Sequence, residues 1–349
     1  MGVLGAGSWG TALALQAERA GQRVTLWGRD AATLASMQEQ RHNARYLPGA
    51  RFGDALRATA SLDETLDRAS APSATPDGET GHRDDGDGIF VLVAVPSHAF
   101  RATLEALAGR VDQRSLRLAW ATKGLELDTG RMTHELVDEL LPACRHRAVL
   151  SGPSFAREVG QGLPTAITAA SGDDGFADEV AERFASETFR VYTSVDVIGV
   201  ETGGAVKNIV AIAAGLSDGL GYGANARVAL VTRGLREMAR FGRAIGAHEA
   251  TFQSLACMGD LVLTCTDDQS RNRRMGLALA RGDGVAAATA DIGQVVEGVR
   301  AARAIHARAR ELDVDMPICE QVYRVLHEGV PVAAAVSALL ARRSGEELV

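Results

Sequence analysis

Lysine is scarce in this chain: of its 37 basic residues only Lys123 and Lys207 are lysines, and the others are arginines. An arginine stays protonated at any workable pH, whereas a desolvated lysine can lose its proton and act as a base. Both lysines lie in apolar, glycine-containing segments, Trp120–Glu126 and Gly203–Asn208. Two explanations account equally well for the presence of only two lysines: they remain by chance in an arginine-biased composition, or they have a catalytic role. The flanking motifs must decide between these explanations.

An excess of basic charge, long apolar runs and paired cysteines are also absent. The formal net charge of −7 leaves no overall basic surface, so neither nucleic acid nor an anionic membrane is expected as the main partner. No run of about 18 apolar residues occurs, and no basic leader precedes an apolar stretch, so we expect a cytoplasmic protein without stable membrane insertion. The 4 cysteines are scattered without metal-ligand spacing, which predicts reduced core thiols and no metal site.

Apolar segments with strand character alternate with amphipathic segments in the first part of the chain. The strand candidates are 89–95, 116–121, 149–151, 165–169 and 189–192, and helical stretches at 103–108 and 132–141 separate several of them. This alternation predicts an α/β domain of the Rossmann type over residues 1–192, with a doubly wound, mostly parallel sheet covered on both faces.

The rest of the chain has helical patterns and hardly any strand candidates. Helices are predicted at 198–216, 225–242, 247–256, 297–311 and 318–326. We therefore expect an all-α substrate and catalytic domain over residues 193–349. One further segment, Arg68–Gly88, is rich in Pro, Gly, Ser and Asp and lacks large apolar side chains, so residues 69–88 are expected to form a mobile surface insertion.

The first motif with chemical content is Gly5-Ala-Gly7-Ser-Trp-Gly10, which has the GxGxxG spacing of a dinucleotide-binding turn. In such a turn Gly5 permits the tight bend, Gly7 lets the backbone approach a pyrophosphate, and Gly10 lets helix and strand pack closely. The motif opens a helix at 11–20 and leads to a second strand at 23–27, as this function requires. Because so few residues precede it, either the first strand is short or the chain start is truncated relative to an ancestral protein.

The end of the second strand bears on the choice of cofactor. A carboxylate directly after this strand would bind the ribose 2′-hydroxyl of NAD, whereas an arginine suits the 2′-phosphate of NADP. Arg29 comes first and Asp30 follows it. The sequence therefore predicts use of NADP with NAD tolerated.

A cluster of polar residues lies between Gly259 and Arg274. Its triplet Ser270-Arg271-Asn272 offers a guanidinium fork with short donors on either side, which is suited to a phosphoryl group. In a chain that already binds a dinucleotide, this triplet predicts a small phosphorylated substrate. Arg273 and Arg274 are expected to form an ordinary solvated basic face.

Taken together, these motifs resemble one known family. They are Gly5–Gly10, Val95–His98, Trp120–Glu126, Ser151–Ala156, Gly203–Asn208, Gly259-Asp260, Ser270–Asn272 and Gln294–Gly298, in this order. The chain resembles the bacterial NAD(P)-dependent sn-glycerol-3-phosphate dehydrogenases over roughly Gly2 to Gly329. The resemblance implies interconversion of dihydroxyacetone phosphate and sn-glycerol 3-phosphate, the backbone donor for phospholipids.

The resemblance also implies roles for individual residues. Lys207 matches the proton acceptor, and Lys123 lies where cofactor and substrate meet; Asp260, Thr264 and Asn208 complete the catalytic group. The substrate positions are Lys123, Gly152, Ser154, Lys207, Asp260, Ser270, Arg271 and Asn272. The cofactor positions are Gly5, Gly7, Ser8, Trp9, Gly10, Arg29, Tyr46, Lys123, Ala156, Arg271, Val295 and Glu297.

In the mechanism that follows, a hydride moves between the nicotinamide and C2 of the three-carbon phosphate while Lys207 exchanges a proton with the C2 oxygen. Burial and a neighbouring ammonium are expected to lower the pKa of Lys207 towards the working pH. A carboxylate in contact would oppose this, so Asp260 is expected to lie off to one side. Lys123 would stabilise the developing negative charge, and each domain would supply one lysine to a shared cleft.

Two other functions remain open on the sequence alone. One is a related two-domain hydroxyacid dehydrogenase acting on an unphosphorylated substrate, against which Ser270-Arg271-Asn272 argues. The other is a dinucleotide-sensing module without turnover, which would need the glycine turn but neither lysine. The apolar helical domain makes a homodimer the expected assembly.

Overall fold

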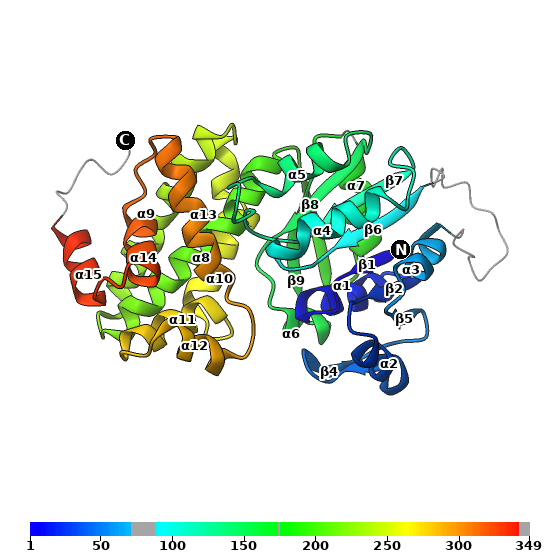
Figure 1. Ribbon diagram of the computed structural model, residues 1–349, viewed down its shortest axis with the longest axis horizontal. Coiled ribbons are helices and arrows are strands. Elements are labelled where there is room, and N and C mark those ends of the chain that lie inside the picture. The colour runs from blue at the N-terminus through cyan, green and yellow to red at the C-terminus, as the bar shows by residue number, and fades with distance from the viewer. Residues whose placement is uncertain (71–87, 174, 342–349) are drawn as a thin grey trace. The chain divides into compact units, whose positions relative to one another are not determined.

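The computed structural model describes residues 1–70, 88–173 and 175–341, and the chain divides into two compact units (Figure 1). Unit 1 comprises Met1–Lys123 with Met132–Glu201, and unit 2 comprises Gly124–Arg131 with Thr202–Val349. The domain boundary expected after residue 192 stays a prediction. The expected insertion lies outside the described residues except at its ends, where residues 69 and 70 belong to helix α3.

Unit 1 is built on an eight-stranded sheet within the described residues, in the order β10-β9-β8-β7-β6-β1-β2-β5. The strands are β1 (Gly2–Leu4), β2 (Val24–Trp27), β5 (Leu56–Thr59), β6 (Ile89–Val93), β7 (Leu116–Trp120), β8 (His146–Ser151), β9 (Thr165–Ala170) and β10 (Phe189–Ser194). Neighbouring strands of this sheet are parallel except for the antiparallel pair β8 and β9. A separate hairpin joins β3 (His42–Asn43) to β4 (Leu47–Arg51). The first strand is therefore short but fully paired.

Helices cover both faces of this sheet. They are α1 (Ser8–Arg19), α2 (Ala31–Gln40), α3 (Leu62–Ser70), α4 (Ser97–Ala108), α5 (Thr133–Leu140), α6 (Ala156–Gly160) and α7 (Phe176–Phe184). Val3 packs in one apolar core with residues of α1 and α7. A Cβ built at Gly2 would instead touch Thr65 of α3, so alternate residues of β1 face opposite helices. The predicted Rossmann-type, mostly parallel sheet buried on both faces is confirmed.

Unit 2 is helical in its described residues from Thr202 onwards, whereas Gly124–Arg131 forms a turn. Its helices are α8 (Val197–Gly219), which begins in unit 1, α9 (Gly223–Ala244), α10 (Asp260–Thr266), α11 (Arg271–Ala280), α12 (Val285–Ile292), α13 (Glu297–Glu311), α14 (Pro317–His327) and α15 (Val332–Leu340). Among the described helices α8 alone is long and apolar enough to cross a membrane, but 89% of its apolar window is buried, as in the core helix of a globular unit. The expected all-α second part is confirmed.

One predicted helix of unit 2 has a different form. Residues 247–256 were expected to be α-helical, but the structure has a 3₁₀ turn at Glu249–Gln253 and a π-helical turn at Leu255–Gly259. The π turn leads directly into α10, whose first residue is Asp260. Short π segments occur frequently at functional sites because they change the direction in which the next side chains point.

Glu237 gives unit 2 a pH-dependent stability. It is buried on α9 and accepts the backbone N–H groups of Ile318 and Cys319 at the start of α14. Burial raises the pKa of Glu237 from 4.5 to about 7. The pKa of Glu237 is higher in the folded than in the unfolded protein. Its contribution to the free energy of unfolding is therefore complete below pH 4.5 and is lost as pH rises to about 7.

We therefore expect the melting temperature of the wild type to fall between pH 5 and 8 by more than that of Glu237→Gln, which has no carboxyl group to titrate. Differential scanning calorimetry at several pH values measures both slopes. Equal slopes would show that Glu237 does not contribute.

Candidate active site

The glycine turn has the conformation expected for a dinucleotide-binding loop. Gly5 has φ +125°, a region that favours glycine, and a Cβ at Gly10 would lie 1.8 Å from the Gly5 carbonyl oxygen. A Cβ at Gly7 would meet nothing within 4 Å, so the surface beside the turn is open. Gly7 is also the N-cap of α1 and provides no side-chain cap to its first N–H groups. These features fit a pyrophosphate at the positive end of the helix dipole.

Asn43 fixes a second segment against this turn, and no sequence motif pointed to it. Its buried carboxamide donates to the Ala6 carbonyl at 3.1 Å and to Thr11 Oγ1 at 2.8 Å, and its oxygen accepts the N–H of Tyr46 at 3.1 Å. Tyr46, a predicted cofactor residue, is thereby linked to the glycine turn. The other two predicted residues of the turn, Ser8 and Trp9, are partly buried in the first turn of α1.

At the end of β2 the two candidate residues for ribose recognition have different surroundings. Asp30 is the N-cap of α2, and its carboxylate accepts the Thr33 N–H at 2.9 Å. This hydrogen bond lowers the pKa of Asp30. The carboxylate thus helps to start α2, and both Arg29 and Asp30 are exposed after the strand.

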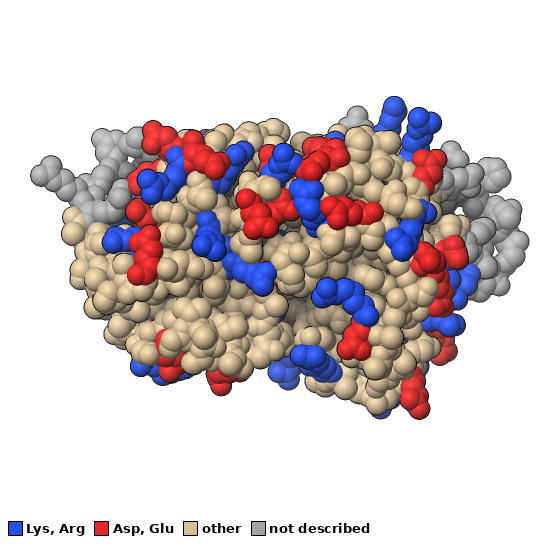
Figure 2. All heavy atoms as spheres, viewed as in Figure 1, with Lys and Arg blue, Asp and Glu red and all other residues tan. Residues whose placement is uncertain are grey.

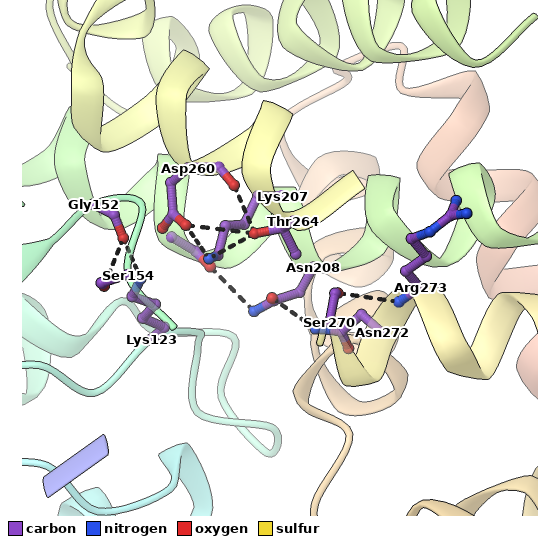
Figure 3. A network of polar contacts seen from close by, with 11 residues as sticks. Lys123, Gly152, Ser154, Lys207, Asn208, Asp260, Thr264, Ser270, Asn272 and Arg273 are labelled. Atoms are coloured by element: carbon purple, nitrogen blue, oxygen red, sulfur yellow. Dashed lines mark hydrogen bonds and ion pairs between the residues drawn. The ribbon is translucent and has the colours of Figure 1, made fainter. Parts of the chain in front are cut away.

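Three predicted residues of unit 1 gather after the ends of β7 and β8. Lys123 Nζ donates to the Gly152 carbonyl at 3.5 Å, and the Ser154 hydroxyl donates to the same oxygen at 3.0 Å (Figure 3). Gly152 has φ +148°, and Ala156 begins α6 shortly afterwards. Because these strands are parallel neighbours, their carboxyl ends lie at the same edge of the sheet, where ligands bind in doubly wound folds.

Unit 2 holds Lys207 in a buried polar cluster. Lys207 is 7% exposed, and its ammonium forms an ion pair with Asp260 and donates to Thr264 Oγ1 at 3.0 Å (Figure 3). Thr264 donates its own proton to the Asp260 carbonyl at 2.6 Å, so it acts as an acceptor towards the lysine.

The expectation that Asp260 lies off to one side is wrong. Its carboxylate contacts Lys207 directly, because a buried ammonium needs a counter-charge. The contact favours the protonated form of Lys207, against the expected loss of its proton.

Asn208, the next residue on α8, joins this cluster to α11. Its Oδ1 accepts from Asn272 Nδ2 at 2.8 Å. Ser270 is the N-cap of α11 and accepts the Arg273 N–H at 3.2 Å. The predicted catalytic helix and the predicted phosphate triplet are therefore in direct contact within unit 2.

Arg271 lies in the first turn of α11 and faces the segment before α13. Its guanidinium donates to the Gln294 side-chain oxygen at 3.3 Å. Burial lowers the pKa of Arg271, and the charge of Glu297 partly opposes this. A partly desolvated guanidinium with a neutral hydrogen-bond partner suits an incoming phosphate, which supplies opposite charge and accepts two N–H groups.

The expectation of a solvated face at Arg273 is wrong, whereas Arg274 is exposed as expected. Arg273 is 8% exposed and pairs with Asp218 at the end of α8 and with Asp268. Helical geometry directs the side chain at position 273 towards α8. The carboxylates of Asp218 and Asp268 compensate the charge of the buried guanidinium. Arg273 anchors the turn that carries the Ser270–Asn272 triplet.

A buried carboxylate near the end of β7 was also missed. Glu201 accepts from Trp120 Nε1 at 2.9 Å and from the Thr133 hydroxyl, and it binds His134 Nδ1 at 2.6 Å. Although burial opposes its charge, the Glu201 carboxylate raises the pKa of His134. The available signal was a single acidic residue within the apolar segment 198–216, because such a residue is buried only when it has partners.

The described part of the chain offers no cluster of metal ligands, and the face drawn in Figure 2 carries charges of both signs. No group of three or more His, Cys, Asp or Glu residues that could hold a metal occurs among residues 1–70, 88–173 and 175–341. Figure 2 shows acidic and basic side chains interspersed on the visible face of the described chain.

Comparison with known proteins agrees with this geometry. Residues 1–72 and 85–181 match the family model for the N-terminus of NAD-dependent glycerol-3-phosphate dehydrogenase, and residues 196–337 match the model for its C-terminus. The glycerol-3-phosphate dehydrogenase (NAD(P)+) of Thioalkalivibrio sulfidiphilus is 54% identical over 340 residues, covering 97% of this chain and 96% of the relative. That of Alkalilimnicola ehrlichii is 48% identical, with coverage of 99% and 98%.

A solved structure agrees with the sequence matches. The crystal structure of glycerol-3-phosphate dehydrogenase from Coxiella burnetii superposes with a TM-score of 0.88 at 43% identity, covering 98% of each chain. Because these family models and relatives cover most of the chain, it belongs to the NAD-dependent glycerol-3-phosphate dehydrogenase family.

Proposed function

We propose that this protein catalyses the reversible NAD(P)-dependent reduction of dihydroxyacetone phosphate to sn-glycerol 3-phosphate. The observation that carries the proposal is the Asn208–Asn272 contact of 2.8 Å. This contact holds Asn208, which follows the proton donor Lys207, against Asn272, which follows the phosphate-binding Arg271. A proton donor and an anion-binding fork are thus kept together within unit 2, as a phosphorylated ketone requires.

The bound cofactor supplies the hydride for C2 of the substrate, and the protein manages the proton. Asp260 and Thr264 fix two N–H directions of the Lys207 ammonium, which also sets the direction of the third. In reduction Lys207 donates to the C2 oxygen; in oxidation its neutral amine accepts that proton. Asp260 keeps the ammonium form available, and Lys123 contributes positive charge to the developing alkoxide.

The phosphate and the rest of the substrate are assigned to residues around α11 and β8. Arg271 binds the phosphoryl oxygens as a fork, and Ser270 and Asn272 add donors at the start of the helix, where the dipole favours an anion. Gly152 and Ser154 of unit 1 are proposed as further substrate contacts.

NADPH is the proposed preferred cofactor. The Asp30 carboxylate caps α2 through one oxygen, which keeps its side chain at the start of that helix. The exposed Arg29 is suited to a 2′-phosphate. The other proposed cofactor residues are Gly5, Gly7, Ser8, Trp9, Gly10, Tyr46, Lys123, Ala156, Arg271, Val295 and Glu297.

Arg29→Ala is expected to raise the KM for NADPH roughly 10- to 100-fold, the range for loss of a charge-assisted hydrogen bond. The KM for NADH should stay within about twofold, because NADH has no 2′-phosphate to lose this contact. Arg23→Ala, at the other end of β2, is the matched control. A parallel rise for both cofactors in the Arg29 variant would contradict the assignment.

In the cell we propose that the enzyme works in the cytoplasm as a homodimer. Its product would supply the backbone of glycerophospholipids.

An initial-rate comparison tests the proposed function. Purified protein should oxidise NADPH in the presence of dihydroxyacetone phosphate, faster than NADH and far faster than with unphosphorylated dihydroxyacetone. Unphosphorylated 2-oxoacids as substrates test for the related hydroxyacid dehydrogenases. NADPH binding without oxidation by any of these ketones would refute the proposal.

A further inference from the structure

Helix α13 receives a cap from another helix. Its N-cap residue Val296 makes no side-chain cap, although the first N–H groups of a helix lack partners within the helix itself. The N–H of Gly298 donates to Asn272 Oδ1 of α11 at 2.9 Å. The conformation at the start of α13 therefore depends on a side chain from α11.

This cap is the first bond of a buried relay (Figure 3 shows its link between Asn272 and Asn208). Asn272 Nδ2 donates to Asn208 Oδ1 at 2.8 Å, and Asn208 Nδ2 donates to the Gly204 carbonyl at 3.2 Å. A backbone donor stands at one end and a backbone acceptor at the other, so both carboxamides have only one orientation that satisfies every bond. The relay runs from α13 through α11 to α8.

The close approach at Gly298 leaves no room for a larger residue. A Cβ at this position would lie 2.6 Å from Asn272 Oδ1, 2.7 Å from the Asn208 carbonyl oxygen and 2.8 Å from Ile212 Cδ1. Two of these neighbours belong to the relay itself. A methyl group at position 298 would therefore push α13 away from Asn272.

The first turn of α11 also contacts the start of segment 294–298, which leads into α13. Arg271 donates to Gln294 at 3.3 Å, and the charge of Glu297 acts on Arg271. Segment 294–298 is thus held by Arg271 at its start and by Asn272 at its end. It contains Val295 and Glu297, which are proposed cofactor residues.

We propose that Asn272 and Gly298 are positioning residues for the cofactor: the relay from Gly204 to Gly298 holds segment 294–298 in the conformation that binds the dinucleotide. This rests on the proposed function and adds to it, because Asn272 was assigned there only to the substrate. A residue placed among the phosphate ligands then also determines cofactor affinity before any substrate is bound.

The test compares full-length wild type with Gly298→Ala, Asn272→Asp and the double variant. Gly298→Ala adds a methyl group to the contact. Asn272→Asp adds no volume but replaces the donor to Asn208 by an acceptor. Gly284→Ala is the control, because a Cβ at this N-cap of α12 would meet nothing within 4 Å.

Two measurements are made without substrate: NADPH binding by its fluorescence, and hydrogen exchange of residues 294–300 in the apo protein. Each single variant should raise the Kd for NADPH roughly 5- to 100-fold, as expected when a buried hydrogen bond is left unmade. Exchange in the segment should accelerate. The loss in the double variant should be smaller than the sum of the two single losses, because the two substitutions disturb neighbouring bonds of one relay.

Unchanged NADPH affinity and exchange in Asn272→Asp would overturn the proposal even if Gly298→Ala failed to fold. Additive losses in the double variant would also overturn it. A substrate-only role for Asn272 would raise the KM for dihydroxyacetone phosphate and leave NADPH binding intact. Failure of the proposed function has a different signature, since the wild type would then bind NADPH but reduce no dihydroxyacetone phosphate.

Discussion

Lys207→Arg is expected to lower kcat by about 10²- to 10⁴-fold, the usual contribution of a positioned general acid or base. The guanidinium keeps the charge beside Asp260 but does not release a proton at working pH. The Kd for NADPH, measured without substrate, should change little. Stopped-flow or steady-state rates of NADPH oxidation measure the loss.

Lys123→Arg is the informative comparison, because the other lysine needs only a compact positive charge in the proposed mechanism. It should impair turnover much less than Lys207→Arg. Melting temperatures of both variants separate a catalytic loss from unfolding. Turnover near that of the wild type in Lys207→Arg would rule out its acid–base role.

Arg271→Ala is expected to raise the KM for dihydroxyacetone phosphate roughly 30- to 1,000-fold, which corresponds to about 2–4 kcal/mol for one partner of a desolvated charge pair. The physical reason is that the phosphate would lose its fork at the start of α11. Unphosphorylated dihydroxyacetone never makes this contact, so at saturating NADPH its kcat/KM should be nearly the same in both proteins.

Arg274→Ala provides the matched control, since this exposed arginine lies on the same helix three residues further on. It should leave the KM for the phosphorylated substrate within about twofold, as is usual for substitutions of exposed residues away from a site. If Arg271→Ala also had no effect on that KM, or weakened both ketones equally, the phosphate assignment would be wrong.

Much of the fold was predictable because it depends on local patterns. The alternation of strands and amphipathic segments indicated the parallel sheet, and residues 297–311 were predicted as the helix that the structure has at α13. The segment 247–256 was not predictable in the same way. Its π-helical turn differs from an α-helix in hydrogen-bond register, and periodicity over so short a segment does not distinguish the two.

The partners of charged side chains were harder to predict than the helices and strands. The sequence showed that Arg273 and Arg274 are adjacent cations, but not that one is buried between Asp218 and Asp268 while the other is exposed. Likewise, from the sequence Asp30 could have bound a ribose hydroxyl of the cofactor or capped a helix. Its hydrogen bond to Thr33 shows that it caps α2.

The glycine turn, the lysine of Gly203–Asn208 and the Ser270–Asn272 triplet could be recognised from the sequence as candidates for binding a dinucleotide, moving a proton and binding a phosphate. Each of these lies within a few residues along the chain, where spacing implies geometry. The contact of Asp260 with Lys207, and the link that Asn272 makes between Asn208 and Gly298, became visible only in the folded chain. A residue type states which hydrogen bonds a side chain can make. The packing of distant helices decides which of them it does make, because a buried polar group must find its partner there.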